Sequence, residues 1–154
     1  MAHYHASLQT SLSCEEAFAY LSDFSTTQEW DPGVVEAHRL EAGEVREGSQ
    51  FRLLARFLGR SIPLTYTIVE YVPTDAVGFL GENRTVVSRD RITFEPAGAG
   101  TRIVYDADLA LKGPLRIADP LLALAFSRVG DRALEGLRKR LGELAASGTP
   151  AVQA

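Results

Sequence analysis

Asp90 is the residue of this sequence whose surroundings best suit acid–base chemistry. The positions two and four residues beyond it are the apolar Ile92 and Phe94. Alternate residues of a β-strand share one face, so a strand here places the carboxylate among apolar side chains. Such a carboxylate has a raised pKa and can act as a general base or hold a ligand hydroxyl, with Tyr66 or Tyr105 as its acid partner. The alternative is an edge position that faces water, and the sequence alone assigns no catalytic residue.

The histidines and the cysteine give weaker signals. His3 and His5 stand two apart, so on a strand both rings point to one face, as two metal ligands would, and His38 could supply a third. Nothing in the sequence brings His38 to that pair, and a terminal His-x-His is more often solvated, so we predict no metal site. Cys14 stands in the first turn of an expected helix without an accompanying base, so we expect an inert thiol. No cofactor is predicted.

Composition limits what can surround these residues. The chain has 154 residues, 45% hydrophobic and 23% charged, which is typical of one globular domain. A net charge of −4 gives no basic surface for nucleic acid, one cysteine excludes an internal disulfide, and no segment is apolar enough for a membrane span. The first residues lack the features of a signal peptide, so we expect a cytoplasmic protein. We expect one domain over residues 3–146 and a flexible tail over residues 147–154.

The first part of the chain predicts one strand and two short helices. Apolar and polar residues alternate over residues 4–9, which is the pattern of a strand. Ser13 and Glu16 have the spacing of a capping box, and apolar residues at helical spacing then predict a helix over about 14–22. A second helical start at Ser25 must end before Pro32, because the residue before a proline avoids helical backbone.

The rest of the chain predicts six more strands and one long helix. Strand patterns alternate with turn signals from Val34 to Leu111. Asp119 then offers an N-cap followed by a proline, and apolar residues recur at spacings of three and four beyond it. The segment 117–126 is apolar on nearly all sides. Burial within the chain is its default interpretation, and a pocket mouth or a second subunit, hence a homodimer, are the alternatives.

Two hairpins assign residues to the faces of the expected sheet. A two-residue loop at Gly59-Arg60 pairs Phe57 with Ile62 and places Glu70 inward unless a bulge reverses it. A second hairpin, across residues 96–100, places Asp90 on the inner face. The same register predicts three ion pairs on the outer face: Glu95–Arg102, Arg91–Asp106 and Arg89–Asp108.

Four short motifs add a family resemblance to this pattern. They are the corner Trp30-Asp31-Pro32, the strand end 68–73 (Ile-Val-Glu-Tyr-Val-Pro), the hairpin 94–101 (Phe-Glu-Pro-Ala-Gly-Ala-Gly-Thr) and Lys112-Gly113-Pro114. With these motifs in this order, the chain resembles the START-like (SRPBCC) superfamily, and its polyketide cyclase/dehydrase branch in particular. The resemblance implies an α+β helix-grip fold, in which a seven-stranded curved antiparallel sheet wraps around a long C-terminal helix. It also implies two short helices between strands 1 and 2, and a hydrophobic cavity between the sheet and the long helix.

We therefore expect this protein to bind a small hydrophobic molecule in that cavity, as a carrier or sensor. One alternative is an enzyme of the polyketide cyclase/dehydratase type that uses the same cavity, and another is a protein-interaction module without a ligand. The family shares no catalytic motif, so the fold does not decide between them. The expected ligand-binding residues are Phe51, Leu53, Phe57, Leu64, Tyr66, Phe79, Asp90, Ile92, Phe94, Tyr105, Leu122 and Phe126.

Overall fold

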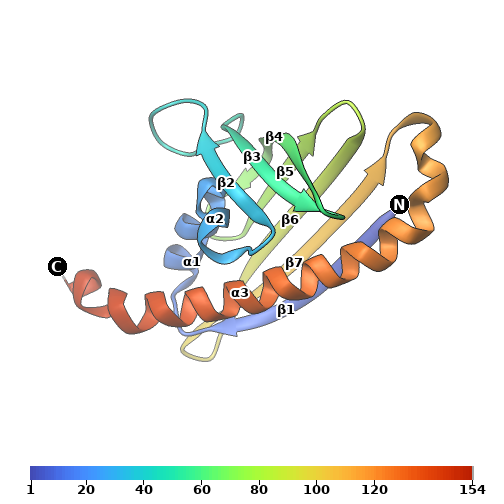
Figure 1. Cartoon of the computed structure of the whole chain (residues 1–154). Helices are drawn as coiled ribbons and strands as arrows, with labels where there is room; N and C mark the ends of the chain where they lie inside the picture. The colour runs from blue at the N-terminus through green and yellow to red at the C-terminus, as the bar shows by residue number, and fades with distance from the viewer. Residues whose placement is uncertain (154) are drawn as a thin grey trace.

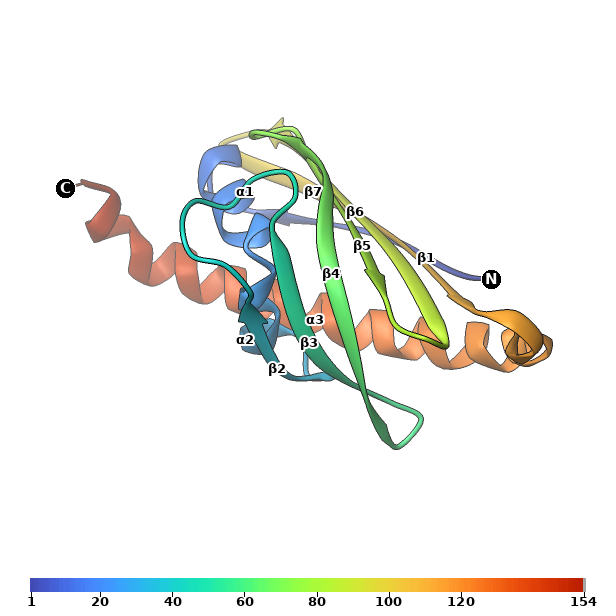
Figure 2. The same cartoon turned by 90° about the horizontal axis from the view of Figure 1, so that it is seen from above.

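Seven antiparallel strands form one curved sheet, and the long helix α3 runs across it (Figures 1 and 2). The computed structural model describes residues 1–153, without the side chains of Asp119 and of residues 148–153. The strand order is β1-β7-β6-β5-β4-β3-β2. The strands are β1 (Ala2–Thr10), β2 (Val34–Arg39), β3 (Gln50–Phe57), β4 (Arg60–Val72), β5 (Ala76–Glu82), β6 (Val86–Ala97) and β7 (Gly100–Leu111). The helical segments are α1 (Cys14–Ser22), η1 (Phe24–Thr26), α2 (Thr27–Trp30), η2 (Gly113–Ala118) and α3 (Asp119–Gln153).

This architecture confirms the predicted α+β helix-grip fold, with the short helices between β1 and β2. The predicted capping box starts α1: the Ser13 hydroxyl accepts from the Glu16 N–H at 3.1 Å, and the Ser13 N–H donates to the Glu16 carboxylate at 3.0 Å. The second short helix ends at Trp30, before Pro32, as the proline rule requires. The predicted N-cap side chain of Asp119 lies outside the described part of the chain. Residues 147–153 of the predicted tail fall in α3, residue 154 lies outside the described part of the chain, and the flexibility of the tail stays a prediction.

The hairpin between β3 and β4 turns one residue earlier than predicted. Phe57 pairs with Arg60, so the loop is Leu58-Gly59 rather than Gly59-Arg60. Both loop residues have positive φ, 53° and 77°, which is the type I′ geometry that matches the twist of the flanking strands. The cross-strand pairs therefore shift by two residues. Because faces alternate with a period of two, the side chains of β3 and of the part of β4 that pairs with it keep their predicted faces.

The hairpin between β6 and β7 has the predicted register, with Asp90 opposite Ala107 and Glu95 opposite Arg102. The Glu95–Arg102 ion pair forms at 2.6 Å. The other two predicted pairs are wrong, because their acidic members, Asp106 and Asp108, contact histidines of β1 on the far side of β7. The prediction considered only β6 and β7, so it did not include contacts with β1.

Glu70 lies on the outer face and not on the inner one. The ladder between β4 and β5 shifts register between Ile68 and Glu70, which is the bulge that reverses the alternation. Glu70 then forms a two-point ion pair with Arg91, whose Nε and Nη2 lie 2.8 and 3.1 Å from the two carboxylate oxygens. The arginine predicted to pair with Asp106 is therefore held by Glu70.

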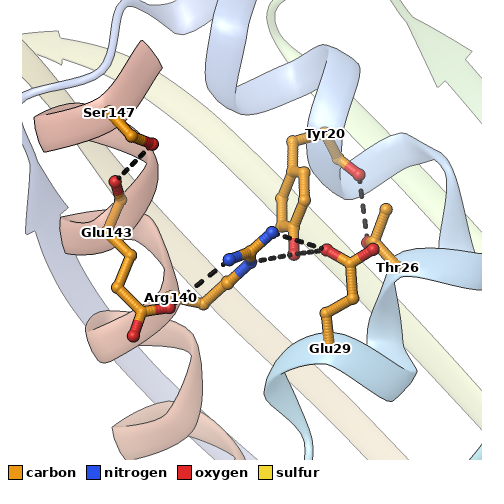
Figure 3. Close-up of polar contacts among 6 residues, drawn as sticks. All are labelled: Tyr20, Thr26, Glu29, Arg140, Glu143 and Ser147. Carbon is orange, nitrogen blue, oxygen red and sulfur yellow. Dashed lines mark hydrogen bonds and ion pairs between the residues drawn. The ribbon is translucent and has the colours of Figure 1, made fainter.

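Two glycines let α3 approach the rest of the molecule closely. A Cβ on Gly130 would lie 2.5 Å from the ring of Tyr4, and a Cβ on Gly136 would lie 1.9 Å from the carbonyl oxygen of Trp30. Further along, the Arg140 guanidinium contacts Glu29 at 3.2 Å and the Tyr20 hydroxyl at 3.4 Å (Figure 3). The contacts of Arg140 therefore join α3 to both α1 and α2.

Beneath α1 and η1 the interior is filled by aromatic rings. Phe24 stacks on Phe79 with ring centroids 4.0 Å apart, and Phe18 packs edge-on against Phe94 at 5.4 Å. Phe51 meets Phe79 edge-on at 6.3 Å. These contacts make one end of the inner face a closely packed core.

The apolar segment 117–126 is only partly buried. Leu122 is 4% exposed, but Ile117, Leu121 and Leu124 are 90%, 73% and 61% exposed. The default interpretation of burial within the chain is therefore wrong for these three residues. The reason is that α3 meets the sheet along one stripe only, and the segment is apolar on its other sides as well.

Candidate ligand-binding site

A cavity of about 490 Å³ lies between the sheet and α3, within the size range of small-molecule sites. Its walls come from β3, β4, β6 and β7 on one side and from η2 and α3 on the other, with η1 and α2 at one end. The lining is largely apolar. Figure 2 shows the sheet and α3, the two elements from which most of these residues come.

The structure divides the predicted ligand-binding residues into two groups. One group lines the cavity: Leu53, Phe57, Leu64, Tyr66, Asp90, Tyr105, Leu122 and Phe126. The other group lies outside the cavity lining: Phe51, Phe79, Ile92 and Phe94. The alternation along the strands predicts which residues lie on the inner face. Whether such a residue is packed in the core or lines the cavity depends on whether α1 and η1 cover that part of the face.

Asp90 is a buried carboxylate at the cavity wall. It accepts hydrogen bonds from the Ser88 hydroxyl at 2.8 Å and from the Tyr105 hydroxyl at 2.7 Å. Burial raises its pKa, and both hydrogen bonds act in the opposite direction because they stabilise the charged form. The predicted partnership of Asp90 with Tyr105 is therefore present as a direct contact.

Asp31 is a second carboxylate in the same cavity, and sequence reasoning missed its role. It follows α2, and its Oδ1 accepts from the Gly33 N–H at 2.8 Å, a turn that fixes the side chain. Burial raises the pKa of Asp31 to about 6, and the charge of Asp90 adds to that effect while the Gly33 bond opposes it. The Trp-Asp-Pro corner was the only signal of this position in the sequence, and it served there as a fold motif.

Two tyrosines complete the polar part of the wall. Tyr66 fits because residue 81, its partner on β5, is a glycine: a Cβ there would lie 2.4 Å from the Tyr66 ring. Burial raises the pKa of the Tyr66 and Tyr105 hydroxyls well above its ordinary value, and the negative charge of Asp90 raises it further. Both phenols are therefore neutral hydrogen-bond donors at physiological pH.

Trp30 contributes a polar group without a partner. It is 5% exposed, it lines the cavity next to Asp31, and its ring meets that of Tyr105 edge-on at 6.4 Å. Within the described residues its Nε1–H finds no hydrogen-bond acceptor. Leaving a buried donor unsatisfied costs about 1–3 kcal/mol, and this nitrogen is closed to solvent.

The opposite end of the cavity is open and apolar. Leu58 at the tip of the β3–β4 hairpin, Leu115 of η2 and Leu121 of α3 line it, and all three are exposed. Figure 1 places η2 and the start of α3 at the end of the sheet away from α1 and α2. Part of the apolar segment 117–126 thus forms a pocket mouth, one of the alternatives that the sequence left open.

The histidines lie elsewhere. His3 and His5 contact Asp108 and Asp106, and His38 lies 3.7 Å from Glu36 on β2. The Asp108 hydrogen bond raises the pKa of His3. Among the residues that the structure describes, no group of three or more His, Cys, Asp or Glu side chains could hold a metal ion. Cys14 accepts a hydrogen bond from Thr101 at 3.4 Å.

Comparison with known proteins places the chain in a family. Residues 1–142 match the family model described as "Polyketide cyclase / dehydrase and lipid transport". The chain belongs to this family. No curated protein matches it in sequence. In the described part of the chain, none of the helices is long and apolar enough to cross a membrane.

Several solved structures share the fold at low sequence identity. The Zhui aromatase/cyclase from Streptomyces sp. R1128 aligns with a TM-score of 0.79 and 13% identity, over 95% of this chain and 96% of that one. A protein from Thermus thermophilus gives 0.77 and 19%, over 94% and 99%. A START superfamily protein from Mycobacterium smegmatis gives 0.70 and 18%, over 92% and 94%. Identities this low establish the fold and leave function to the site.

Proposed function

We propose that this protein binds one small, largely hydrophobic molecule between its sheet and α3, as a carrier or sensor. The observation that carries the proposal is the cavity of about 490 Å³ with an apolar lining and a polar wall at one end. That combination is typical of small-molecule sites, in which apolar surface supplies affinity and a few polar groups fix orientation. Membership in the family supports the same proposal.

Titration with a neutral apolar fluorophore, N-phenylnaphthylamine, tests it. We expect one saturable site per chain in the folded protein. Leu64→Trp should abolish the signal, because Leu64 is a buried residue of the cavity wall and the larger ring occupies the space. Leu40→Trp is the matched control, since Leu40 is half-exposed and outside the lining. Fluorescence that rises only as the protein begins to unfold would refute a preformed site.

A second candidate function is catalysis of aldol cyclisation and dehydration. The contact between Asp90 and Tyr105 favours it, because a base and an acid meet at the cavity wall. Asp90 would remove a proton from a carbon between two carbonyls, that carbon would form a bond to a second carbonyl carbon, and the carbonyl oxygen would take a proton from Tyr105. The protonated Asp90 would return its proton to the Tyr105 oxygen, to which it is hydrogen-bonded. In the dehydration Asp90 would remove the second proton from the same carbon, the C–O bond would break as the hydroxyl takes a proton from Tyr105 and leaves as water, and Asp90 would again reprotonate Tyr105. Turnover of a linear poly-β-ketone thioester that is lost in Asp90→Asn, with probe binding retained, would establish the enzyme. Binding without turnover would leave the carrier or sensor.

A further inference from the structure

Two carboxyl groups lie at the polar end of the cavity, and the described residues pair no cation with either. Asp31 and Asp90 both line it, and they are close enough for the charge of Asp90 to act on Asp31. Within the described residues, neither carboxylate forms an ion pair with a lysine or arginine. The lining arginines are Arg56 and Arg60 of the β3–β4 hairpin. The backbone N–H of Arg56 donates to the Gly33 carbonyl at 2.6 Å, so β3 passes close to the turn that holds Asp31.

The hydrogen bonds around these carboxyl groups suit their charged forms. Asp90 accepts from two hydroxyls, of Ser88 and Tyr105, and Asp31 accepts from the Gly33 N–H. These donors favour the anion, whereas burial has the larger effect and raises the pKa of both groups, so a cation beside them would favour their charged forms. A buried anion without a counter-ion is costly, and a cation delivered by a ligand would remove that cost.

The side chains next to the carboxylates also favour a cation. Trp30, Tyr66, Tyr105 and Phe24 line the same cavity, and the faces of aromatic rings attract positive charge. An ammonium group on an apolar body would meet carboxylate oxygens and ring faces together.

We propose that the cavity selects an apolar molecule whose polar end is a protonated amine, held between Asp31 and Asp90 against the aromatic rings. This inference rests on the proposed function and specifies its ligand class. The apolar body lies among the leucines and phenylalanines toward the mouth, and the ammonium lies at the α2 end. The same charge repels carboxylates, so fatty-acid-like anions are poor ligands.

A series of four probes with one apolar body tests the preference: naphthylethylamine, naphthylethanol, naphthylacetate and ethylnaphthalene, measured by calorimetry at neutral pH. We expect the amine to bind about ten- to hundredfold more tightly than ethylnaphthalene, and the acetate to bind most weakly. An alcohol or acetate that binds as tightly as the amine overturns the inference while the proposed function stands. Failure of every probe, ethylnaphthalene included, overturns the proposed function itself.

Asparagine variants assign the preference to its residues. Asp31→Asn keeps an acceptor oxygen for the Gly33 N–H and removes the charge, so it should lower amine affinity about tenfold or more and leave ethylnaphthalene unchanged. Asp90→Asn should act in the same direction. Asp75→Asn, an exposed position outside the lining, is the control for the change in net charge. Unchanged amine affinity in both cavity variants overturns the assignment, and the wild-type probe series tests the preference even if a variant fails to fold.

Discussion

At the scale of single residues, the most informative feature is a carboxyl group whose charge the fold disfavours. Burial raises the pKa of Asp31 from its ordinary value of 3.8 to about 6. The folded protein therefore holds a proton on Asp31 over a pH range in which the unfolded chain has lost it. Protonation of Asp31 therefore contributes to the free energy of unfolding. This contribution is fully present below about pH 4 and is lost as the pH rises through 6.

Asp31→Asn should remove this pH dependence. Above pH 6 the variant should be more stable than the wild type by about 1–3 kcal/mol, because no buried charge has to form. Below pH 4 the two proteins should have similar free energies of unfolding, since the wild-type side chain is then neutral in both states. Urea denaturation at a series of pH values measures the difference. A variant that is less stable at neutral pH would show that Asp31 has a favourable partner as an anion.

The two carboxylates also show what a sequence reveals about a site. Asp90 was predictable because it breaks the apolar alternation of its own strand, which is local information. Asp31 was not, since no pattern in its surroundings distinguishes it from any turn aspartate. Asp31 lines the cavity because α2 and the turn before β2 close one end of the sheet. Most strands of that sheet are far from Asp31 in the sequence, so a local pattern does not reveal this position.

At the scale of elements, local rules predicted most boundaries and failed where a third element intervened. The capping box at Ser13 and the proline at 32 each set a helix end within the segment itself. The ion pairs of Asp106 and Asp108 depended on β1, and the orientation of Glu70 depended on a bulge against β5. The turn at Leu58-Gly59 failed for a different reason. Glycine suits either position of a two-residue loop, so the loop could not be located to one residue.

The packing of α3 gives a prediction at this scale. Gly136→Ala should cost at least about 2 kcal/mol, because its Cβ would lie 1.9 Å from the backbone oxygen of Trp30 and the helix would have to move. Gly142→Ala, on the same helix, has no atom within 4 Å of its Cβ and should stabilise the protein by up to about 1 kcal/mol. Thermal unfolding of both variants measures the contrast. Equal effects of the two substitutions would mean that α3 does not pack here as described.

At the scale of the whole molecule, the interior has two parts that differ in how closely they are packed. The end covered by α1 and η1 is filled by stacked and edge-on rings. The end covered by α3 is hollow, and its walls have packing partners on one side only. A ligand would therefore complete the packing of the molecule, and its binding should raise the free energy of unfolding in proportion to occupancy.

This division can be tested without a ligand by adding volume at one alanine in each part. Ala17 is a fully buried residue of α1 outside the cavity lining, so Ala17→Leu should overpack the core and cost about 1–3 kcal/mol or more. Ala107 is also buried but lines the cavity, so Ala107→Leu should place its extra atoms in empty space. Its free energy of unfolding should stay within about 1 kcal/mol of the wild type or rise, because new dispersion contacts form without strain. Urea denaturation midpoints at constant slope measure both changes. If Ala107→Leu is as destabilising as Ala17→Leu, the cavity is closed in solution, and the proposals that depend on it fail together.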